Sequence, residues 1–274
     1  GCCLMPVHVE THANISDAAR ALSSARDGRF FGGGTLLMRA LNEADQSIGT
    51  IVRCTDPVLR QVRSEGDRIA IGAGVTMAEI MANRDLAFLA PVARIIGGPA
   101  VRSAATVGGN LFAEPPYGDF TTALLALDAS VRFAGESGQS TPLQDFLRDR
   151  ANRRGRVVES VMVPRITDPK ALRFVKVTRV KPKGAALMSI AAWLPGSGGR
   201  GCRIAYGNMA PTPVRAAAAE RALEGASLSE QGIARALQAA TEGLTPPTDM
   251  FASEWYRRKV APVHLKRLLL GQGQ

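Results

Sequence analysis

The sequence predicts an α+β protein with two domains. Its first part alternates short apolar stretches typical of strands with alanine-rich stretches typical of helices, and two glycine loops interrupt the pattern. After residue 164 the pattern changes to three strand-like segments followed by three helical ones. Because such a change in element order indicates a separate layer of structure, we expect one domain over residues 1–166 and a second over residues 167–274.

The elements of the first domain follow from local sequence. We expect strands over residues 5–10, 29–31, 47–53, 58–64, 67–72, 131–134 and 155–164. We expect helices over residues 16–26, 36–42, 76–81, 85–96 and 120–127, the first capped at Ser16-Asp17 and the last by Asp119. Residues 102–119 hold many glycines and prolines, which predicts a long ordered loop.

The second domain has a simpler pattern. Strands are expected over residues 172–180, 187–194 and 203–207, and the last two are joined by a turn at residues 195–199. Helices are expected over residues 214–223, 229–242 and 253–269.

Charge is concentrated in one stretch. The net charge is +10, and residues 169–219 carry nine basic side chains and no acidic one. Such a stretch can be a solvated surface, bind nucleic acid, dock an acidic partner or face an anionic cofactor. Aromatic residues make up only 5% of the chain and do not alternate with basic ones, which argues against a nucleic-acid partner.

Composition excludes several other classes. No apolar run approaches the length of a membrane span, and the first residues show no signal-peptide pattern, so we expect no membrane insertion and no export signal on this chain. The four cysteines form no CxxC pair and the three histidines are scattered, so we expect no metal site on this chain. We also find no GxSxG, HExxH, Walker or GxGxxG signature, and expect no catalytic acid or base.

Two glycine loops are the informative motifs. In the first, Gly32, Gly33, Gly34 and Thr35 present successive backbone N–H groups suited to a phosphate, although glycine triplets are also common as flexible turns. The second runs from Ala105 to Leu111. Its glycines allow close backbone approach, Thr106 and Asn110 provide directed hydrogen bonds, and the later Asp119 suits sugar hydroxyls or simply caps a helix. Together they favour a dinucleotide held from two sides.

These motifs resemble those of a known family. The segments Gly32-Gly33-Gly34-Thr35 and Thr106-Val107-Gly108-Gly109-Asn110-Leu111, followed by Asp119, look like the FAD-binding medium subunit of molybdenum hydroxylases, which include xanthine dehydrogenase, aldehyde oxidase and carbon monoxide dehydrogenase. The segments 174–176, 207–215 and 253–258 resemble the C-terminal domain of the same family. The resemblance implies a two-lobed FAD-binding domain of the vanillyl-alcohol-oxidase (PCMH) type, split near residues 50–55, followed by a C-terminal α+β domain.

The resemblance also implies roles for individual residues. Gly32, Gly33, Gly34, Thr35 and Leu36 would wrap the FAD pyrophosphate. Thr106, Gly109, Asn110 and Asp119 would hold the other phosphate, ribityl and adenosine parts, and Val157 and Val158 would pack on the adenine or the ring edge. Lys176 would lie near the isoalloxazine ring, where a cation stabilises negative charge on the reduced flavin.

The implied function is electron transfer within an enzyme complex. The chain would carry FAD in a heteromeric oxidoreductase, with molybdopterin on a large subunit and two-iron–two-sulfur (2Fe-2S) clusters on a small one. It would pass electrons from the clusters to an external acceptor, in the cytoplasm, or in the periplasm if a partner subunit carries it there. The basic stretch 169–219, with Arg200 and Arg203, is then a candidate docking surface.

Three departures from the family pattern keep alternatives open: Leu36 in the first loop, Lys181-Pro182-Lys183-Gly184 after Arg179, and Tyr117-Gly118 before Asp119. Family members usually carry an aspartate where this chain has Leu36, so a carboxylate is missing from the first loop. One alternative is a structural subunit of the same complex that has lost FAD. Another is a stand-alone flavin oxidoreductase on the same fold.

Overall fold

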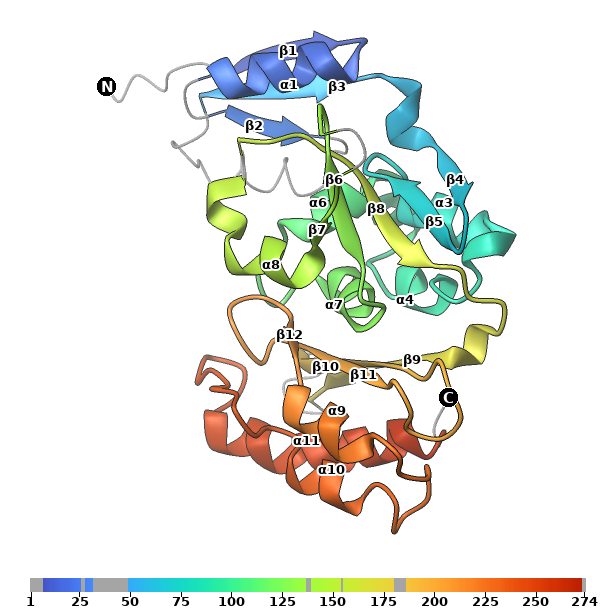
Figure 1. Cartoon of the computed structure of the whole chain (residues 1–274). Coiled ribbons are helices and arrows are strands. Elements are labelled where there is room, and N and C mark those ends of the chain that lie inside the picture. Colours follow the sequence, from blue (N-terminus) through green and yellow to red (C-terminus); the bar gives the residue numbers. More distant parts are fainter. Residues whose placement is uncertain are drawn as a thin grey trace. The chain divides into compact units, whose positions relative to one another are not determined.

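The chain folds into two compact units, each assembled from several stretches of sequence (Figure 1). The computed structural model describes residues 7–25, 28–31, 49–136, 139–153, 155–179 and 186–272. Unit 1 consists of Gly1–Asn83, Ala93–Ala113 and Ala129–Arg165. Unit 2 consists of Arg84–Val92, Glu114–Asp128 and Ile166–Gln274. Helices and sheets occur in both units, which confirms the α+β class.

Unit 1 contains a small parallel sheet that is covered by one helix. The strand order is β1 (His8–His12), β3 (Thr50–Cys54), β2 (Gly28–Phe31), and α1 (Ile15–Ser24) packs on this sheet. The helix starts earlier than predicted, because the Asn14 side chain accepts hydrogen bonds from the backbone N–H groups of Ser16 and Asp17. The helix predicted over residues 36–42 lies outside the described residues.

The larger sheet of unit 1 is antiparallel and has five strands. Their order is β4 (Val62–Glu65), β5 (Arg68–Gly72), β8 (Val158–Pro164), β6 (Ser130–Phe133), β7 (Thr141–Pro142). The central strand β8 is almost entirely buried, as expected for an apolar run with a neighbour on each side. The second half of the strand predicted over residues 58–64 is confirmed as β4, and its first half is a 3-10 helix, η1 (Pro57–Arg60), which the Asp56 carboxylate caps at the Val58 N–H.

Short helices surround this sheet; the helix predicted over 76–81 is confirmed, and the others differ most from the prediction. They are α3 (Met77–Ala82), α5 (Pro99–Ala104), α6 (Val107–Leu111), α8 (Leu143–Arg148) and the 3-10 turn η3 (Arg150–Arg153). Residues predicted as a long loop therefore contain α6 and the end of α5. The helix predicted over 85–96 is broken into η2 (Arg84–Leu86) and α4 (Ala90–Arg94), since Pro91 has no N–H to donate and lies in the first turn of α4, where proline is favoured.

Unit 2 has an antiparallel four-stranded sheet between two layers of helix. Its order is β12 (Val214–Arg215), β11 (Arg203–Gly207), β10 (Ala186–Trp193), β9 (Leu172–Thr178), preceded by the 3-10 turn η4 (Pro169–Ala171). Helix α7 (Asp119–Ala126) packs on β10 and β11 on one side of the sheet. On the other side lie α9 (Ala217–Leu223), α10 (Ala234–Gln238) and α11 (Glu254–Leu269) (Figure 1).

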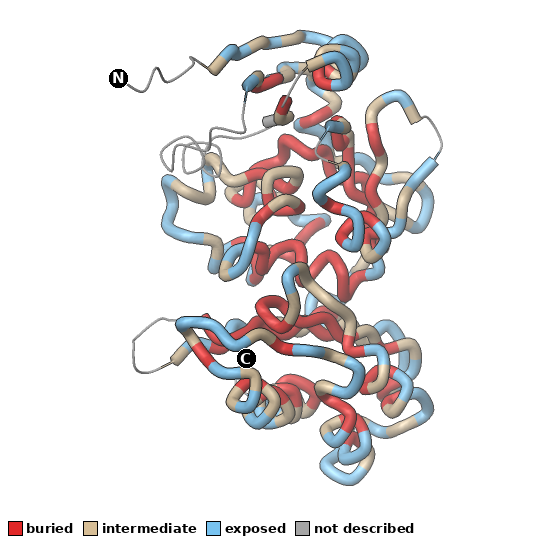
Figure 2. The backbone as a smooth tube through the Cα atoms, turned by 90° about the vertical axis from the view of Figure 1, so that its left-hand side faces the viewer, coloured by how far each residue is buried: buried red, intermediate tan, exposed pale blue. Residues whose placement is uncertain are grey.

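Burial follows this layering. Every residue of α7 is buried, and Figure 2 shows that buried segments, drawn in red, run through the interior of each unit. Side chains from β10, β11 and α11, among them Ile190, Tyr206 and Leu265, form the core on the other side of the sheet. The prediction of α11 is confirmed, whereas the helices predicted over 214–223 and 229–242 are shorter than expected. No helix in the described ranges is both long and apolar enough to cross a membrane.

Candidate functional site

The second glycine loop is bound to a segment that sequence reasoning did not single out. Residues 105–108 pair with residues 73–77, which follow β5, and an isolated β-bridge joins Thr76 to Thr106. The backbone bonds are Met77 N–H to Ala105 O (2.9 Å), Val107 N–H to Val75 O (3.0 Å) and Gly108 N–H to Ala73 O (2.8 Å). The loop is therefore held in one shape by the backbone of its neighbour.

Helix α6 begins inside this loop. The Thr106 hydroxyl oxygen accepts a hydrogen bond from the Gly109 N–H at 3.1 Å, and the Thr106 carbonyl accepts one from the Asn110 N–H at 3.0 Å. The Asn110 side-chain amide also donates to the Thr106 carbonyl at 3.2 Å. Four successive N–H groups, from Val107 to Asn110, are thus used within the protein.

Gly108 has a steric role at this point. A Cβ atom on Gly108 would lie 3.0 Å from the Ala73 Cβ and 3.1 Å from the Ala73 carbonyl oxygen, closer than most real contacts. The close backbone approach that the glycine pair predicts is therefore an approach of Gly108 to Ala73. In the sequence, only Gly72-Ala73-Gly74 at the end of a predicted strand indicates this close contact.

Side-chain groups of the loop remain suited to a ligand. The Thr106 hydroxyl accepts one hydrogen bond and, among the described residues, donates none, so its hydrogen can go to a phosphate oxygen. Thr106 and Asn110 are both buried, and Gly109 is half-buried. The first loop, with Gly32, Gly33, Gly34, Thr35 and Leu36, lies outside the described residues.

The two valines of the predicted site belong to the core of unit 1. Val157 packs with Ala18, Leu22 and Val52 beneath α1, and Val158 is the first residue of β8. Both are at least 98% covered by protein, with exposed fractions of 2% and 1%. Their predicted contact with the adenine or the ring edge stays a prediction.

In unit 2 the structure brings Asp119 and Lys176 together. Lys176 Nζ on β9 lies 2.9 Å from Asp119 Oδ2, and the Asp119 side chain is buried while that of Lys176 is about one-third exposed (32%). Asp119 does not cap α7 as predicted, because Gly118 is the N-cap, in the left-handed conformation (φ 102°), and no side chain caps the helix. The carboxylate instead holds the ammonium group.

Lys176 of this ion pair belongs to a row of three neighbouring residues across the sheet. Lys176 on β9, Ser189 on β10 and Gly207 on β11 lie in one row across the sheet. A Cβ atom on Gly207 would lie 2.3 Å from the Ser189 hydroxyl oxygen and 2.7 Å from that of Thr122 on α7. Gly207 therefore allows α7 to approach the sheet closely. The roles of Ser189 and Thr122 were not predicted. The only sequence feature that indicates the close approach is a glycine at the end of a predicted strand.

Most of the described cations of the basic stretch bind other groups of the protein. Five of its nine cations bind groups of unit 2: Arg173, Lys176, Arg179, Arg203 and Arg215. Lys170 and Arg200 are exposed, and Lys181 and Lys183 lie outside the described residues. The docking surface over 169–219 stays a prediction, in which most of the described cations also bind carbonyl or carboxylate groups of unit 2.

Each unit, taken by itself, carries groups of a kind that a dinucleotide binds. In unit 1 this group is the Thr106 hydroxyl, which can donate to a phosphate or sugar oxygen. In unit 2 they are an ammonium group, which binds anionic oxygens, and a carboxylate, which accepts from sugar hydroxyls. FAD carries both kinds of group, so the residues present are compatible with it.

Comparisons with known proteins give a consistent result. Residues 6–166 match the family model described as "FAD binding domain in molybdopterin dehydrogenase", and residues 174–271 match "CO dehydrogenase flavoprotein C-terminal domain". The nicotine 6-hydroxylase medium subunit of Paenarthrobacter nicotinovorans is 26% identical over 284 residues, covering 98% of both chains. The carbon monoxide dehydrogenase medium chain of Afipia carboxidovorans is 26% identical over 266 residues, covering 93% of this chain and 92% of that one.

A solved structure agrees over nearly the whole chain. It is a carbon monoxide dehydrogenase from Hydrogenophaga pseudoflava that lacks the Mo-pyranopterin moiety of its cofactor. The match has a TM-score of 0.84 at 26% identity and covers 96% of each chain.

Proposed function

Because the chain belongs to the family of FAD-binding domains in molybdopterin dehydrogenases, we propose that it transfers electrons within a heteromeric molybdenum hydroxylase. It is an FAD-binding medium subunit of this family and part of an oxidoreductase. Its partners are a large subunit with molybdopterin and a small subunit with 2Fe-2S clusters. Electrons reach this chain from the small subunit and leave to an external acceptor.

The ion pair between Asp119 and Lys176 is the observation that supports this role most directly. FAD, when bound, supplies the redox chemistry. The chain's own contribution is a cation, Lys176, whose position is held by a buried carboxylate at 2.9 Å while about one-third of its side chain remains accessible (32%). Such a cation stabilises negative charge that develops beside it, and Asp119 keeps the charge from moving away.

The other predicted contacts keep the roles that the resemblance implies. Gly32, Gly33, Gly34, Thr35 and Leu36 bind the pyrophosphate. Thr106 donates its hydroxyl hydrogen to a phosphate, Gly109 and Asn110 line the phosphate and sugar groups, and Asp119 accepts from a sugar hydroxyl. Val157 and Val158 provide apolar contact.

The absorption spectrum of the purified protein tests FAD binding first. We expect a flavin spectrum, and FAD identified by chromatography in the supernatant after heat release. A colourless protein that cannot be reconstituted with added FAD would contradict the proposal and favour the subunit that has lost FAD. Molybdenum and iron analysis of the purified complex tests the partners, because a flavoprotein that carries neither metal in its complex would contradict the assigned electron path.

A further inference from the structure

A buried cation binds the chain just after the second glycine loop. Arg150 is the first residue of the 3-10 turn η3, and only 6% of it is exposed. Its Nη1 group donates hydrogen bonds to the Ala113 carbonyl at 2.9 Å and to the Leu111 carbonyl at 3.3 Å. A charged group is costly to bury unless it is hydrogen-bonded, so the guanidinium and these carbonyls fix each other's position.

Both carbonyls lie at the C-terminal end of α6. The last carbonyls of a helix have no partner within the helix, and a cation placed there also interacts favourably with the helix dipole. Leu111 is the last residue of α6, and its exposed fraction is 0%. Solvent therefore does not reach its carbonyl, and Arg150 supplies a hydrogen bond in place of water.

Helix α6 depends on outside support, because its own sequence does not favour a helix. Two of its five residues, Gly108 and Gly109, are glycines, and glycine is the least favourable helix residue after proline. A helix this short does not form on its own in water. Residues 73–77 bind its start through backbone hydrogen bonds. Arg150 gives comparable support to its end.

A ring contact joins the same end of α6 to the segment that carries Arg150. Phe112, directly after α6, has its ring centre 5.5 Å from that of Phe146 on α8, in an edge-to-face arrangement. Phe146 also lies against Phe133 on β6, with 6.0 Å between the ring centres. Helix α8 is therefore fixed to the large sheet, and Arg150, which follows α8 closely, has a firm base.

The start of the same helix carries predicted FAD contacts. Thr106 is the N-cap of α6, and Gly109 and Asn110 lie within the helix. A helix of five residues is only about 7.5 Å long, so a shift of its end also moves the Thr106 hydroxyl. Groups that bind a ligand must be held to within a fraction of an ångström by the residues behind them.

We propose that Arg150 is a positioning residue for FAD, which holds α6 where the Thr106 hydroxyl donates to a phosphate oxygen. This inference rests on the proposed function, and it adds a residue that acts on the predicted site from behind. Its action passes through the Leu111 and Ala113 carbonyls and along α6.

The test measures the FAD affinity of the purified chain, by titrating FAD-free protein and following flavin fluorescence. Arg150→Met removes the donors and the charge, whereas Arg150→Lys keeps a charged donor. Arg148→Met, at an exposed arginine on α8, is the matched control. Leu265→Ala, in the core of unit 2 on the side of the sheet away from α7, lowers stability without changing α6.

We expect Arg150→Met to weaken FAD binding about tenfold, the size of one hydrogen bond to a charged group, and Arg150→Lys to recover part of this loss. Thr106→Val should also weaken binding. Adding Arg150→Met to Thr106→Val should have little further effect, because both substitutions act on the same phosphate contact. Arg148→Met and folded Leu265→Ala keep wild-type affinity. If Arg150→Met does not fold, Arg150→Gln, which keeps a neutral donor, replaces it in the same comparison.

Three results would overturn the proposal. The first is wild-type FAD affinity in the variant that lacks the Arg150 charge. The second is an equal loss of affinity in Leu265→Ala, which would show that Arg150 acts only through stability. The third is additive effects of the substitutions at Arg150 and Thr106, which would show that Arg150 does not act through the Thr106 contact. A wild-type chain that binds no FAD would instead contradict the proposed function.

Discussion

The second glycine loop in unit 1 and the start of α7 in unit 2 position their predicted FAD contacts in different ways. The loop is shaped by backbone bonds to residues 73–77 and by the contact of Gly108 with Ala73. At the start of α7, an ion pair between buried Asp119 and partly exposed Lys176 holds the functional groups. The comparison shows that a glycine beside polar residues can indicate two kinds of site. One depends on shape and the other on charge.

The largest expected effect follows from adding volume to the loop. Gly108→Val places a side chain against the Ala73 Cβ and carbonyl oxygen, and we expect it to lower the free energy of unfolding by about 2–3 kcal/mol. FAD bound per chain should fall as well, because the loop must move. Urea unfolding and the flavin-to-protein absorbance ratio measure both. Gly98→Val is the control, since an added Cβ there meets no atom within 4 Å. Equal stability of the two variants would show that shape does not govern the loop.

A smaller effect is expected when charge is removed from unit 2. Lys176→Met leaves the Asp119 carboxylate buried without its cation, which should cost about 1–2 kcal/mol of unfolding free energy. Adding Asp119→Asn should recover part of this cost, because an amide is cheaper to bury than a carboxylate. A double-mutant cycle by urea unfolding gives the coupling energy. If the effects of the two single substitutions on the free energy of unfolding were additive, the ion pair would make no contribution to stability, and charge would not explain how this site is held.

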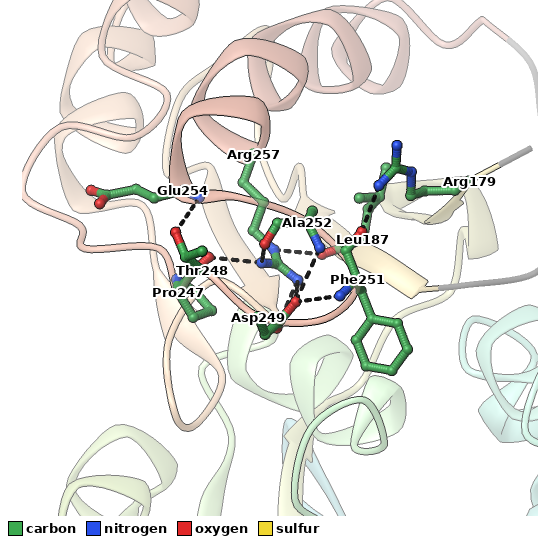
Figure 3. A network of polar contacts seen from close by, with 9 residues as sticks. All are labelled: Arg179, Leu187, Pro247, Thr248, Asp249, Phe251, Ala252, Glu254 and Arg257. Carbon is green, nitrogen blue, oxygen red and sulfur yellow. Dashed lines mark hydrogen bonds and ion pairs between the residues drawn. The ribbon is translucent and has the colours of Figure 1, made fainter. Parts of the chain in front are cut away.

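The smallest expected effect is on stability at low pH. Burial raises the pKa of Asp249, but the Phe251 and Ala252 N–H groups and the Arg257 guanidinium (Figure 3) outweigh it, so this pKa lies below its ordinary value of 3.8. A lowered pKa in the folded state contributes stability above the unfolded pKa, and this is lost as pH falls through the folded value. The carboxylate is partly solvated, so we expect a contribution of about 0.5 kcal/mol. Asp249→Asn should lose less stability than the wild type between pH 6 and pH 3, measured by urea unfolding.

Strong local signals were enough to predict much of the fold. Short apolar runs predicted β5, β8, β10 and β11, and a serine cap before a long helical segment predicted α11. Short helices were missed because their stability comes from partners distant in sequence. Helix α6 contains two glycines and forms because residues 73–77 bind its first turn. Proline broke the helix expected over 85–96, and a cap two residues upstream moved the start of α1.

The candidate site was predicted less completely. The glycine loops and Asp119 were recognised from the sequence, but the partner of a charged side chain is not a local property. Nothing around Asp119 indicates that its carboxylate pairs with a lysine 57 positions later. The same holds for the basic stretch. Its cations bind carbonyl and carboxylate groups that only the tertiary structure brings near, such as the Leu268 carbonyl for Arg173.

The placement of α7 bears on how the protein is made. Its eight residues are buried against strands of unit 2, yet they leave the ribosome before residues 186–207, which form β10 and β11. Domains generally fold as units during synthesis, the N-terminal one first. Here unit 2 cannot complete its fold until the chain is nearly finished. The apolar surface of α7 stays uncovered during that interval, and an interruption of translation between residues 126 and 186 leaves a fragment prone to aggregation.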